Sequence, residues 1–191
     1  MSLWKKSITL ISFVIFMVMF FKVCGMITKE LGIFYPGVDI YVTFLFGCFV
    51  ICYYKESFKI ALLSYLLMLV IFMTFREKVE TSYNFDWYLW KWLKIIGKNK
   101  TVLVNVLGNL FLFFPLSVII LSIKEKYFIS FLLTIIIVVL LEIVQLVSRR
   151  GVFDLVDIVL NIIGIIIGMI GFRVISYISR KGKKEKNGTF V

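Results

Sequence analysis

The sequence predicts an all-α protein, a polytopic helical membrane bundle of about six transmembrane helices. Of the 191 residues, 61% are hydrophobic, and the mean hydropathy is +1.01, whereas soluble domains are about 45–50% apolar. The apolar residues come in blocks about 20 residues long, which is the length of helix that crosses a bilayer core of about 30 Å. These blocks and their connections occupy nearly the whole chain, so no room is left for a separate soluble domain.

The expected spans follow one another with mostly short connections. We place them at residues 7–26, 38–54, 58–75, 101–122, 127–147 and 155–178. The charged start and the apolar run after it are similar to a signal peptide, but no small-x-small cleavage site follows, so we expect an uncleaved first helix. Pro115 predicts a kink in the fourth span, because membrane helices tolerate proline where neighbouring groups satisfy the freed backbone.

Glycines recur in the sixth span, at Gly164, Gly168 and Gly171. Small residues about four positions apart allow two helix backbones to approach closely. We interpret this set as packing residues.

Two basic segments lie outside the expected spans. The connection 76–100 is the longest and interleaves tryptophan with lysine, a combination typical of the membrane–water interface. We expect a short amphipathic helix on the membrane surface there. The segment 179–191 is rich in lysine, and we expect it to be a disordered basic tail.

The distribution of charge predicts an orientation in the membrane. The formal net charge is +11, and the cations gather in connections and tails, where they meet anionic lipid headgroups. Nucleic-acid binding is disfavoured, because it uses a basic face on a folded surface. Cations in short connections count most, so Lys5, Lys6, Lys124 and Lys126 predict a multi-pass protein of the cell membrane with both termini in the cytoplasm.

The residue types exclude several kinds of catalytic site. The chain has no histidine, which excludes histidine-based zinc sites and every Ser–His–Asp or Cys–His arrangement. The three cysteines, Cys24, Cys48 and Cys52, lie in or beside apolar segments and are expected to pack as small hydrophobic residues. We expect no cofactor and no metal site, and we expect membrane lipids as partners.

Polar residues interrupt the apolar blocks at the ends of four expected spans. Because spans alternate in direction, the ends of the third and fifth and the starts of the fourth and sixth lie on the same side, in the outer leaflet of the topology above. Within a span these residues are spaced so that they share one helix face. The sequence therefore predicts one polar group of residues: Arg76, Asn105, Asn109, Glu142, Gln145, Arg149, Arg150, Asp154, Asp157 and Asn161.

Two interpretations of these residues remain open. A charge near the membrane midplane costs roughly 2.5–3.5 kcal/mol on insertion scales, and pairing with Arg76, Arg149 or Arg150 would lower the cost. The residues could then form a network that locks the last helices together. Alternatively they line a polar cavity that binds a ligand, which we favour because ionisable groups within membranes are functional candidates.

Two stretches of this sequence resemble a known family. The run 105–115, NVLGNLFLFFP, resembles the first signature of the VanZ-like membrane proteins, and the runs 142–145 and 149–164 resemble the second. The two signatures have the expected order and separation. Where members of the family commonly have glycine two residues after the proline, this chain has Ser117.

The resemblance implies a domain organisation and a phenotype. We expect two transmembrane helices within residues 1–57 that lie outside the family match, a VanZ-like membrane domain at 58–178 and the basic tail at 179–191. The family's namesake is associated with low-level resistance to the glycopeptide teicoplanin. The resemblance therefore implies a bacterial cell-envelope protein involved in antibiotic resistance, but it implies no reaction.

Two functions follow as hypotheses. In the first, the outer-leaflet residues bind a lipid, a cell-wall precursor or the tail of a lipoglycopeptide, which lowers the effective antibiotic concentration. In the second, the protein is a membrane-embedded enzyme acting on a lipid-linked or envelope substrate. Glu142, Asp154 and Asp157 would then act as acid and base with Arg149 or Arg150 holding a phosphate, or the carboxylates would hold Mg²⁺ or Ca²⁺. A transporter is disfavoured, because the polar residues lie in one leaflet and no inverted repeat is visible.

Overall fold

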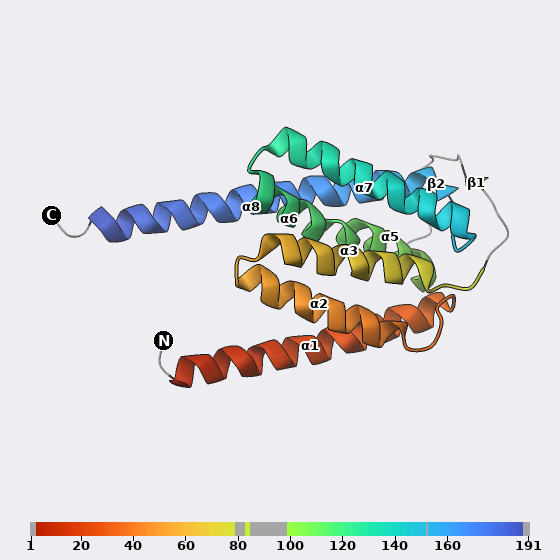
Figure 1. The fold of residues 1–191 in the computed structure, drawn as a ribbon, viewed down its shortest axis with the longest axis horizontal. Coiled ribbons are helices and arrows are strands. Elements are labelled where there is room, and N and C mark those ends of the chain that lie inside the picture. The colour runs from red at the N-terminus through yellow and green to blue at the C-terminus, as the bar shows by residue number, and fades with distance from the viewer. Residues whose placement is uncertain (1–2, 79–82, 85–98, 152, 189–191) are drawn as a thin grey trace.

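The chain folds into a bundle of helices that lie roughly along one axis (Figure 1). The computed structural model describes the backbone of residues 3–78, 83–84, 99–151 and 153–188, and side chains within 11–78, 99–151 and 154–178. In chain order the elements are α1 (Leu3–Leu31), α2 (Val38–Tyr54), α3 (Phe58–Thr74), β1 (Tyr83–Asn84), α5 (Lys100–Leu112), α6 (Phe114–Lys124), α7 (Tyr127–Ser148), β2 (Phe153–Asp154) and α8 (Leu155–Gly188). The two short strands pair in parallel, and the all-α class is confirmed.

The helices alternate in direction, so that both termini lie at the same end of the bundle (Figure 1). α1, α2 and α3 lie side by side, α7 and α8 lie on the other side, and α5 with α6 contacts both groups. Within the described residues, 4 helical stretches are long and apolar enough to cross a membrane: Ile11–Leu31, Lys100–Lys124, Tyr127–Ser148 and Leu155–Ile178. α2 and α3 are shorter apolar helices, and together these elements match the expected spans.

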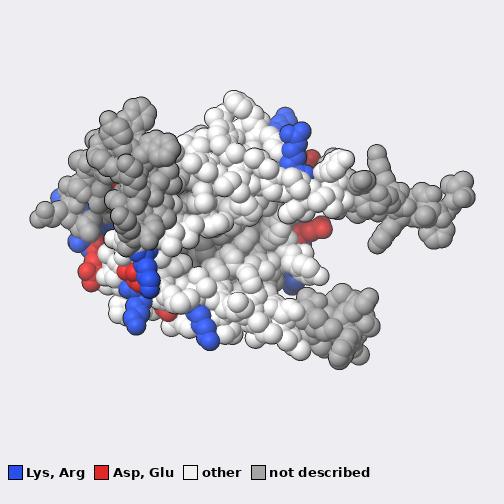
Figure 2. Space-filling model, turned by 180° about the vertical axis from the view of Figure 1, so that it is seen from behind, with Lys and Arg blue, Asp and Glu red and all other residues white. Residues whose placement is uncertain are grey.

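The outer surface of the bundle is apolar. Large hydrophobic side chains such as Phe44, Ile136 and Val147 are 67%, 53% and 76% exposed. On the face in Figure 2 the middle of the molecule carries few charged side chains, and the lysines, arginines, aspartates and glutamates gather toward the two ends. An apolar belt between charged ends suits the hydrocarbon and headgroup layers of a bilayer. The chain is therefore a multi-pass membrane protein.

The helix that contains Pro115 is broken, which confirms the predicted kink. α5 ends at Leu112, and α6 begins at Phe114 with Pro115 in its first turn. The hydroxyl of Tyr65, a buried residue of α3, donates a hydrogen bond of 2.7 Å to the carbonyl oxygen of Leu112. A carbonyl at a helix end needs such a partner where water has no access. α3 therefore stabilises the break.

Glycines on α8 determine how closely α8 approaches the broken helix. A Cβ atom added to Gly164 would collide with the backbone oxygen of Leu110. A Cβ atom added to Gly168 would lie 2.7 Å from the backbone oxygen of Phe114, whereas one on Gly171 would make an ordinary contact at 3.7 Å. The packing interpretation is therefore confirmed for Gly164 and Gly168, which bring α8 against α5 and α6.

The segments outside the spans differ in part from expectation. α8 continues to Gly188, so the prediction of a disordered tail is wrong for residues 179–188. An existing helix extends without a new nucleation step, and lysine and glutamate are good helix formers. The surface helix expected within residues 76–100 falls largely on 79–82 and 85–98, outside the described residues.

The glycine contacts predict the effect of adding a single methyl group. Gly164→Ala should lower the free energy of unfolding by about 1–3 kcal/mol or more, because the new Cβ forces two backbones apart. Gly108→Ala is the matched control, since nothing lies within 4 Å of the added Cβ, and alanine should stabilise that helical position by about 0.5–1 kcal/mol. Unfolding in detergent measures both variants. A Gly164→Ala protein as stable as the parent would contradict the packing account.

Candidate functional site

The α1–α2 connection fixes the backbone of Arg76 at the end of α3. Phe34 and Arg76 form an antiparallel bridge. Beside it, the Tyr35 amide donates to the carbonyl oxygen of Phe75 at 3.2 Å, and the Glu77 amide donates to the carbonyl oxygen of Ile33 at 2.7 Å. A segment far away in the sequence therefore sets the direction in which Arg76 leaves α3.

The guanidinium of Arg76 lies against two aromatic rings. Its Cζ lies 4.9 Å from the ring centroid of Phe34 and 5.3 Å from that of Phe72, which is within the range of cation–π attraction. Its Nε donates to the carbonyl oxygen of Phe72 at 3.1 Å. Burial lowers the pKa of Arg76 to about 10, although Glu142 and Asp157 favour its charged form. Arg76 is therefore a cation at neutral pH.

The carboxylate of Asp157, on α8, lies beside two asparagines of α5. Asn105 Nδ2 donates to Asp157 Oδ1 at 3.5 Å, a long hydrogen bond. Asn109, one turn further along α5, is also close enough to interact with this carboxylate. Its Nδ2 nevertheless has no hydrogen bond of good geometry within the described part of the chain. α5 and α8 thus bring together the polar residues of the first and second signatures.

Glu142 and Asn161 are deeply buried and have unsatisfied polar atoms. Glu142 is 3% exposed and lies within electrostatic range of Asp157, Arg76 and Asp154. Its Oε2 lacks a hydrogen-bond partner among the described residues. Asn161 is 0% exposed, and both polar atoms of its side chain lack partners in the same part of the chain. Such atoms cost free energy unless something satisfies them.

The connection between α7 and α8 uses two more of the predicted residues for structure. Asp154 Oδ1 accepts a 2.8 Å hydrogen bond from the amide of Val156 and so caps the start of α8. The backbone oxygen of Gln145 accepts the amide of Arg150 at 3.0 Å. The side chain of Gln145 lies against Gly151, where an added Cβ would come within 3.2 Å of Oε1. These contacts hold the turn beside the carboxylates.

The two arginines of this turn have different environments. The guanidinium of Arg150 donates to the backbone oxygen of Arg76 and lies 5.5 Å from the ring centroid of Tyr35. Arg150 therefore ties the α7–α8 turn to the end of α3. Arg149 takes the left-handed conformation that ends α7, with φ 55°, and its side chain is exposed. The structure thus brings nine of the ten predicted residues to one region and turns Arg149 outward.

We use the name polar cluster for the buried and half-buried groups of this region: Arg76, Asn105, Asn109, Glu142, Asp154, Asp157 and Asn161. The cluster lies at the end of the bundle opposite the termini (Figure 1). Asn161 lies about 9 Å along α8 from its first residue, at a rise of about 1.5 Å per residue. The cluster therefore reaches from the interface into one leaflet.

Among the described residues, no group of three or more Asp, Glu or Cys side chains could hold a metal ion. A cavity of about 630 Å³ is present in the structure, but it is lined by residues at the other end of the bundle and by none of the cluster.

The aromatic residues that contact the two arginines are not among the residues predicted from the sequence. These are Phe34, Tyr35 and Phe72. The only local signal is that two of them stand directly before Pro36 in the connection between the first two spans. Their pairing with residues after α3 is a long-range contact that no helical periodicity encodes.

Comparison with known proteins gives one match. Residues 40–176 match the model of the VanZ/LLP1 family. The match begins near the start of α2, so most of α2 lies within it, although residues 1–57 were expected to lie outside. That expectation rested on signature motifs in the later helices, and α2 carries none of them. No curated protein and no solved structure matches the chain. Because the matched region covers well over half of the sequence and contains both signatures, the chain belongs to the VanZ/LLP1 family.

Proposed function

We propose that the polar cluster binds a lipid headgroup or a cell-wall-related ligand in the outer leaflet, and that this binding contributes to resistance to glycopeptide and lipoglycopeptide antibiotics. One observation carries the proposal. Glu142 and Asn161 are almost fully buried, yet three of their polar atoms have no partner among the described residues. Buried polar groups are normally satisfied, and a ligand with donors and acceptors would satisfy these.

The chemistry of the cluster favours a polar, anionic or zwitterionic ligand. Arg76 supplies a cation with several donors, suited to a phosphate or carboxylate. The amides of Asn109 and Asn161 can both donate and accept. Glu142 and Asp157 accept hydrogen bonds from hydroxyl, amide or ammonium groups. Cell-wall precursors and lipid headgroups combine these groups in one molecule.

The proposed role in resistance comes from the family. The namesake of the VanZ-like proteins is associated with teicoplanin resistance, and this chain belongs to the same family. Binding of a precursor or of the antibiotic's lipid tail near the outer surface would lower the antibiotic concentration at its target. The polar cluster is the group of residues where both family signatures meet.

A membrane-embedded enzyme is the second candidate. Its support is a buried carboxylate, Glu142, and a half-buried carboxylate, Asp157, which lie within electrostatic range of each other and of Arg76. Such a group could exchange protons with a substrate. In the version that uses Mg²⁺ or Ca²⁺, these carboxylates would hold the ion. Product formation from a lipid-linked substrate by the purified protein would favour the enzyme.

Asn161→Leu tests the binding proposal. Leucine has a similar size and no polar atoms, so it should leave the free energy of unfolding unchanged or raise it by about 1–3 kcal/mol, the cost of unsatisfied buried groups. Protection against teicoplanin should fall to the level of cells that lack the protein. The measurements are the minimum inhibitory concentration, the yield of folded protein and unfolding in detergent. Full protection by a well-folded Asn161→Leu protein would remove the main support for the site.

Asp157→Asn and Glu142→Gln complete this test. Each keeps the shape of the side chain and removes its charge, so the protein should fold in normal yield while protection is lost. If the carboxylates serve only structural pairing, the loss of one partner should cost about 3–5 kcal/mol, and yield would fall together with protection. Glu77→Gln is the matched control, since Glu77 is an exposed carboxylate next to Arg76, and it should retain both.

We also propose that the termini are cytoplasmic, so that the polar cluster faces outward. The support is the positive charge near the end where the termini lie, at Lys55, Lys59, Lys124 and Lys126, because cations near span ends favour the cytoplasmic side. In a background without native cysteines, Gly188→Cys should react with a membrane-impermeant maleimide only after the cells are opened. Lys100→Cys, at the other end of the bundle, should react in intact cells. The reverse pattern would invert the topology.

A further inference from the structure

A second site lies at the end of the bundle where the termini are found. A cavity of about 630 Å³ is formed by the end of α2, the start of α3, the end of α6, the start of α7 and the later part of α8. This volume is within the range of small-molecule sites, about 300–1,000 Å³. None of the residues around it belongs to the polar cluster, so the site is independent of the proposed function.

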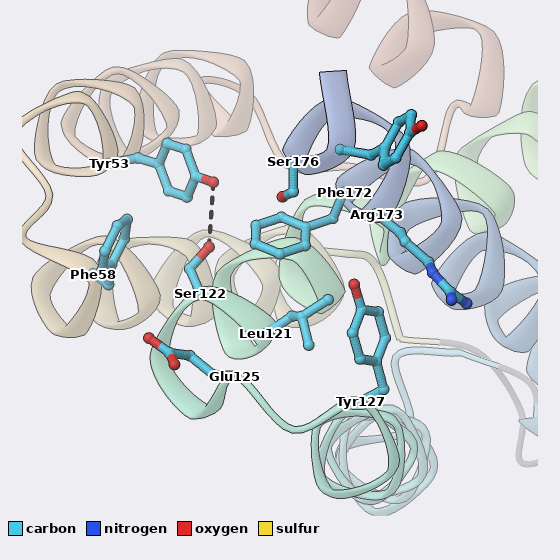
Figure 3. Close-up of a pocket in the computed structure, with 10 residues that line it drawn as sticks. Tyr53, Phe58, Leu121, Ser122, Glu125, Tyr127, Phe172, Arg173 and Ser176 are labelled. Atoms are coloured by element: carbon cyan, nitrogen blue, oxygen red, sulfur yellow. Dashed lines mark hydrogen bonds between the residues drawn. The ribbon is translucent and has the colours of Figure 1, made fainter. Parts of the chain in front are cut away.

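The walls of the cavity combine apolar and polar groups. Leu121, Phe58 and Phe172 supply apolar surface, and Tyr53 stacks edge-on against Phe58 with centroids 5.4 Å apart. The hydroxyl of Tyr53 lies 3.3 Å from Ser122 Oγ, the hydrogen bond drawn in Figure 3. Amphiphilic walls of this kind suit a molecule that is polar at one end and apolar at the other.

The cavity also holds charges of both signs. Figure 3 shows Glu125 and Arg173 on opposite sides of the space, with Phe172 and Leu121 between them. Arg173 is an exposed residue of α8, and Glu125 is an exposed residue in the turn between α6 and α7. A ligand that fills the space meets a guanidinium at one side and a carboxylate at the other, so the lining favours a zwitterion over an anion.

The depth of the cavity identifies the layer of the membrane that it meets. Arg173 is about 27 Å along α8 from its first residue, at a rise of about 1.5 Å per residue. The hydrocarbon core is about 30 Å thick, so Arg173 reaches the interface opposite the polar cluster. The phosphates and amines of phospholipids occupy this layer, and tyrosines are enriched there.

We propose that this cavity binds the headgroup of a zwitterionic phospholipid with a primary ammonium. The phosphate contacts Arg173, the ammonium contacts Glu125 and the nearby aromatic faces, and the glycerol and upper chains lie on the apolar wall. Arginine pairs strongly with phosphate, and an ammonium is attracted both to a carboxylate and to aromatic rings. No covalent step is involved.

Native mass spectrometry of the full-length protein in detergent tests this proposal. The probes are dioleoyl phosphatidylethanolamine and dioleoyl phosphatidylglycerol, added separately. The parent protein should bind the ethanolamine lipid about tenfold more tightly, because only that lipid carries the ammonium for Glu125. Free phosphoethanolamine, which lacks acyl chains, should compete at least about tenfold more weakly than the lipid.

Variants at Arg173 and Glu125 test the contributions of the two charges one at a time. Arg173→Gln should weaken binding of both lipids about tenfold, whereas Glu125→Gln should weaken only the ethanolamine lipid. Lys124→Gln is the control for a lost cation. Glu56→Gln is the control for a lost carboxylate. Glu56 has the same left-handed backbone conformation as Glu125, with φ 59° against 56°, but it lines two neighbouring cavities and not this one. Both controls should bind as the parent does.

The replaced residues are exposed, so the variants should unfold at the temperature of the parent, and each affinity can be read directly. Equal affinity of the parent for the two lipids would overturn the proposal. So would a Glu125→Gln protein that keeps its preference for the ethanolamine lipid. A loss of affinity in the two control variants equal to that in Arg173→Gln and Glu125→Gln would also overturn it, because nonspecific surface charge would then explain the binding.

Discussion

Arg76 is the cation whose charge acts on carboxylates from two different helices, one of them buried and the other half-buried. Glu142 on α7 and Asp157 on α8 both favour its charged form, and each lies within electrostatic range of it. Moving isolated charges out of water costs several kcal/mol per ion, so these carboxylates depend on a nearby cation and on amide donors. α3 can supply the cation at this position only because the α1–α2 connection pairs with the residues after its last turn.

Backbone packing makes the electrostatic arrangement geometrically feasible. Gly164 and Gly168 allow α8 to lie directly against α5 and α6, which brings the carboxylate of Asp157 to Asn105. The break at Pro115 gives α5 and α6 separate directions, and Tyr65 satisfies the carbonyl that the break exposes. Apolar packing therefore sets the positions, and the polar cluster forms where α5, α7, α8 and the end of α3 meet.

Much of the fold and part of the site follow from the sequence. Block hydropathy predicts the spans, and their alternation places the polar residues of four segments at one end, as the structure has them. Residue spacing does not predict which of two adjacent arginines faces the inside of the bundle. Arg149 ends α7 in a left-handed conformation and is exposed, whereas the side chain of Arg150 donates a hydrogen bond to the backbone oxygen of Arg76 after α3. The aromatic supports of Arg76 depend on long-range pairing, and the cavity at the other end depends on shape, so no local pattern reveals either.

The coupling between Arg76 and Glu142 is the central claim, and a double-mutant cycle measures it directly. The quantity is the free energy of unfolding in detergent for the parent, Arg76→Gln, Glu142→Gln and the combined variant. Arg76→Gln alone should lower the free energy of unfolding, because it removes the cation whose charge acts on Glu142 and Asp157. Adding Glu142→Gln should restore part of that stability, since it removes one of the uncompensated charges. Losses that simply add in the combined variant would show that the two residues act independently and would contradict the account.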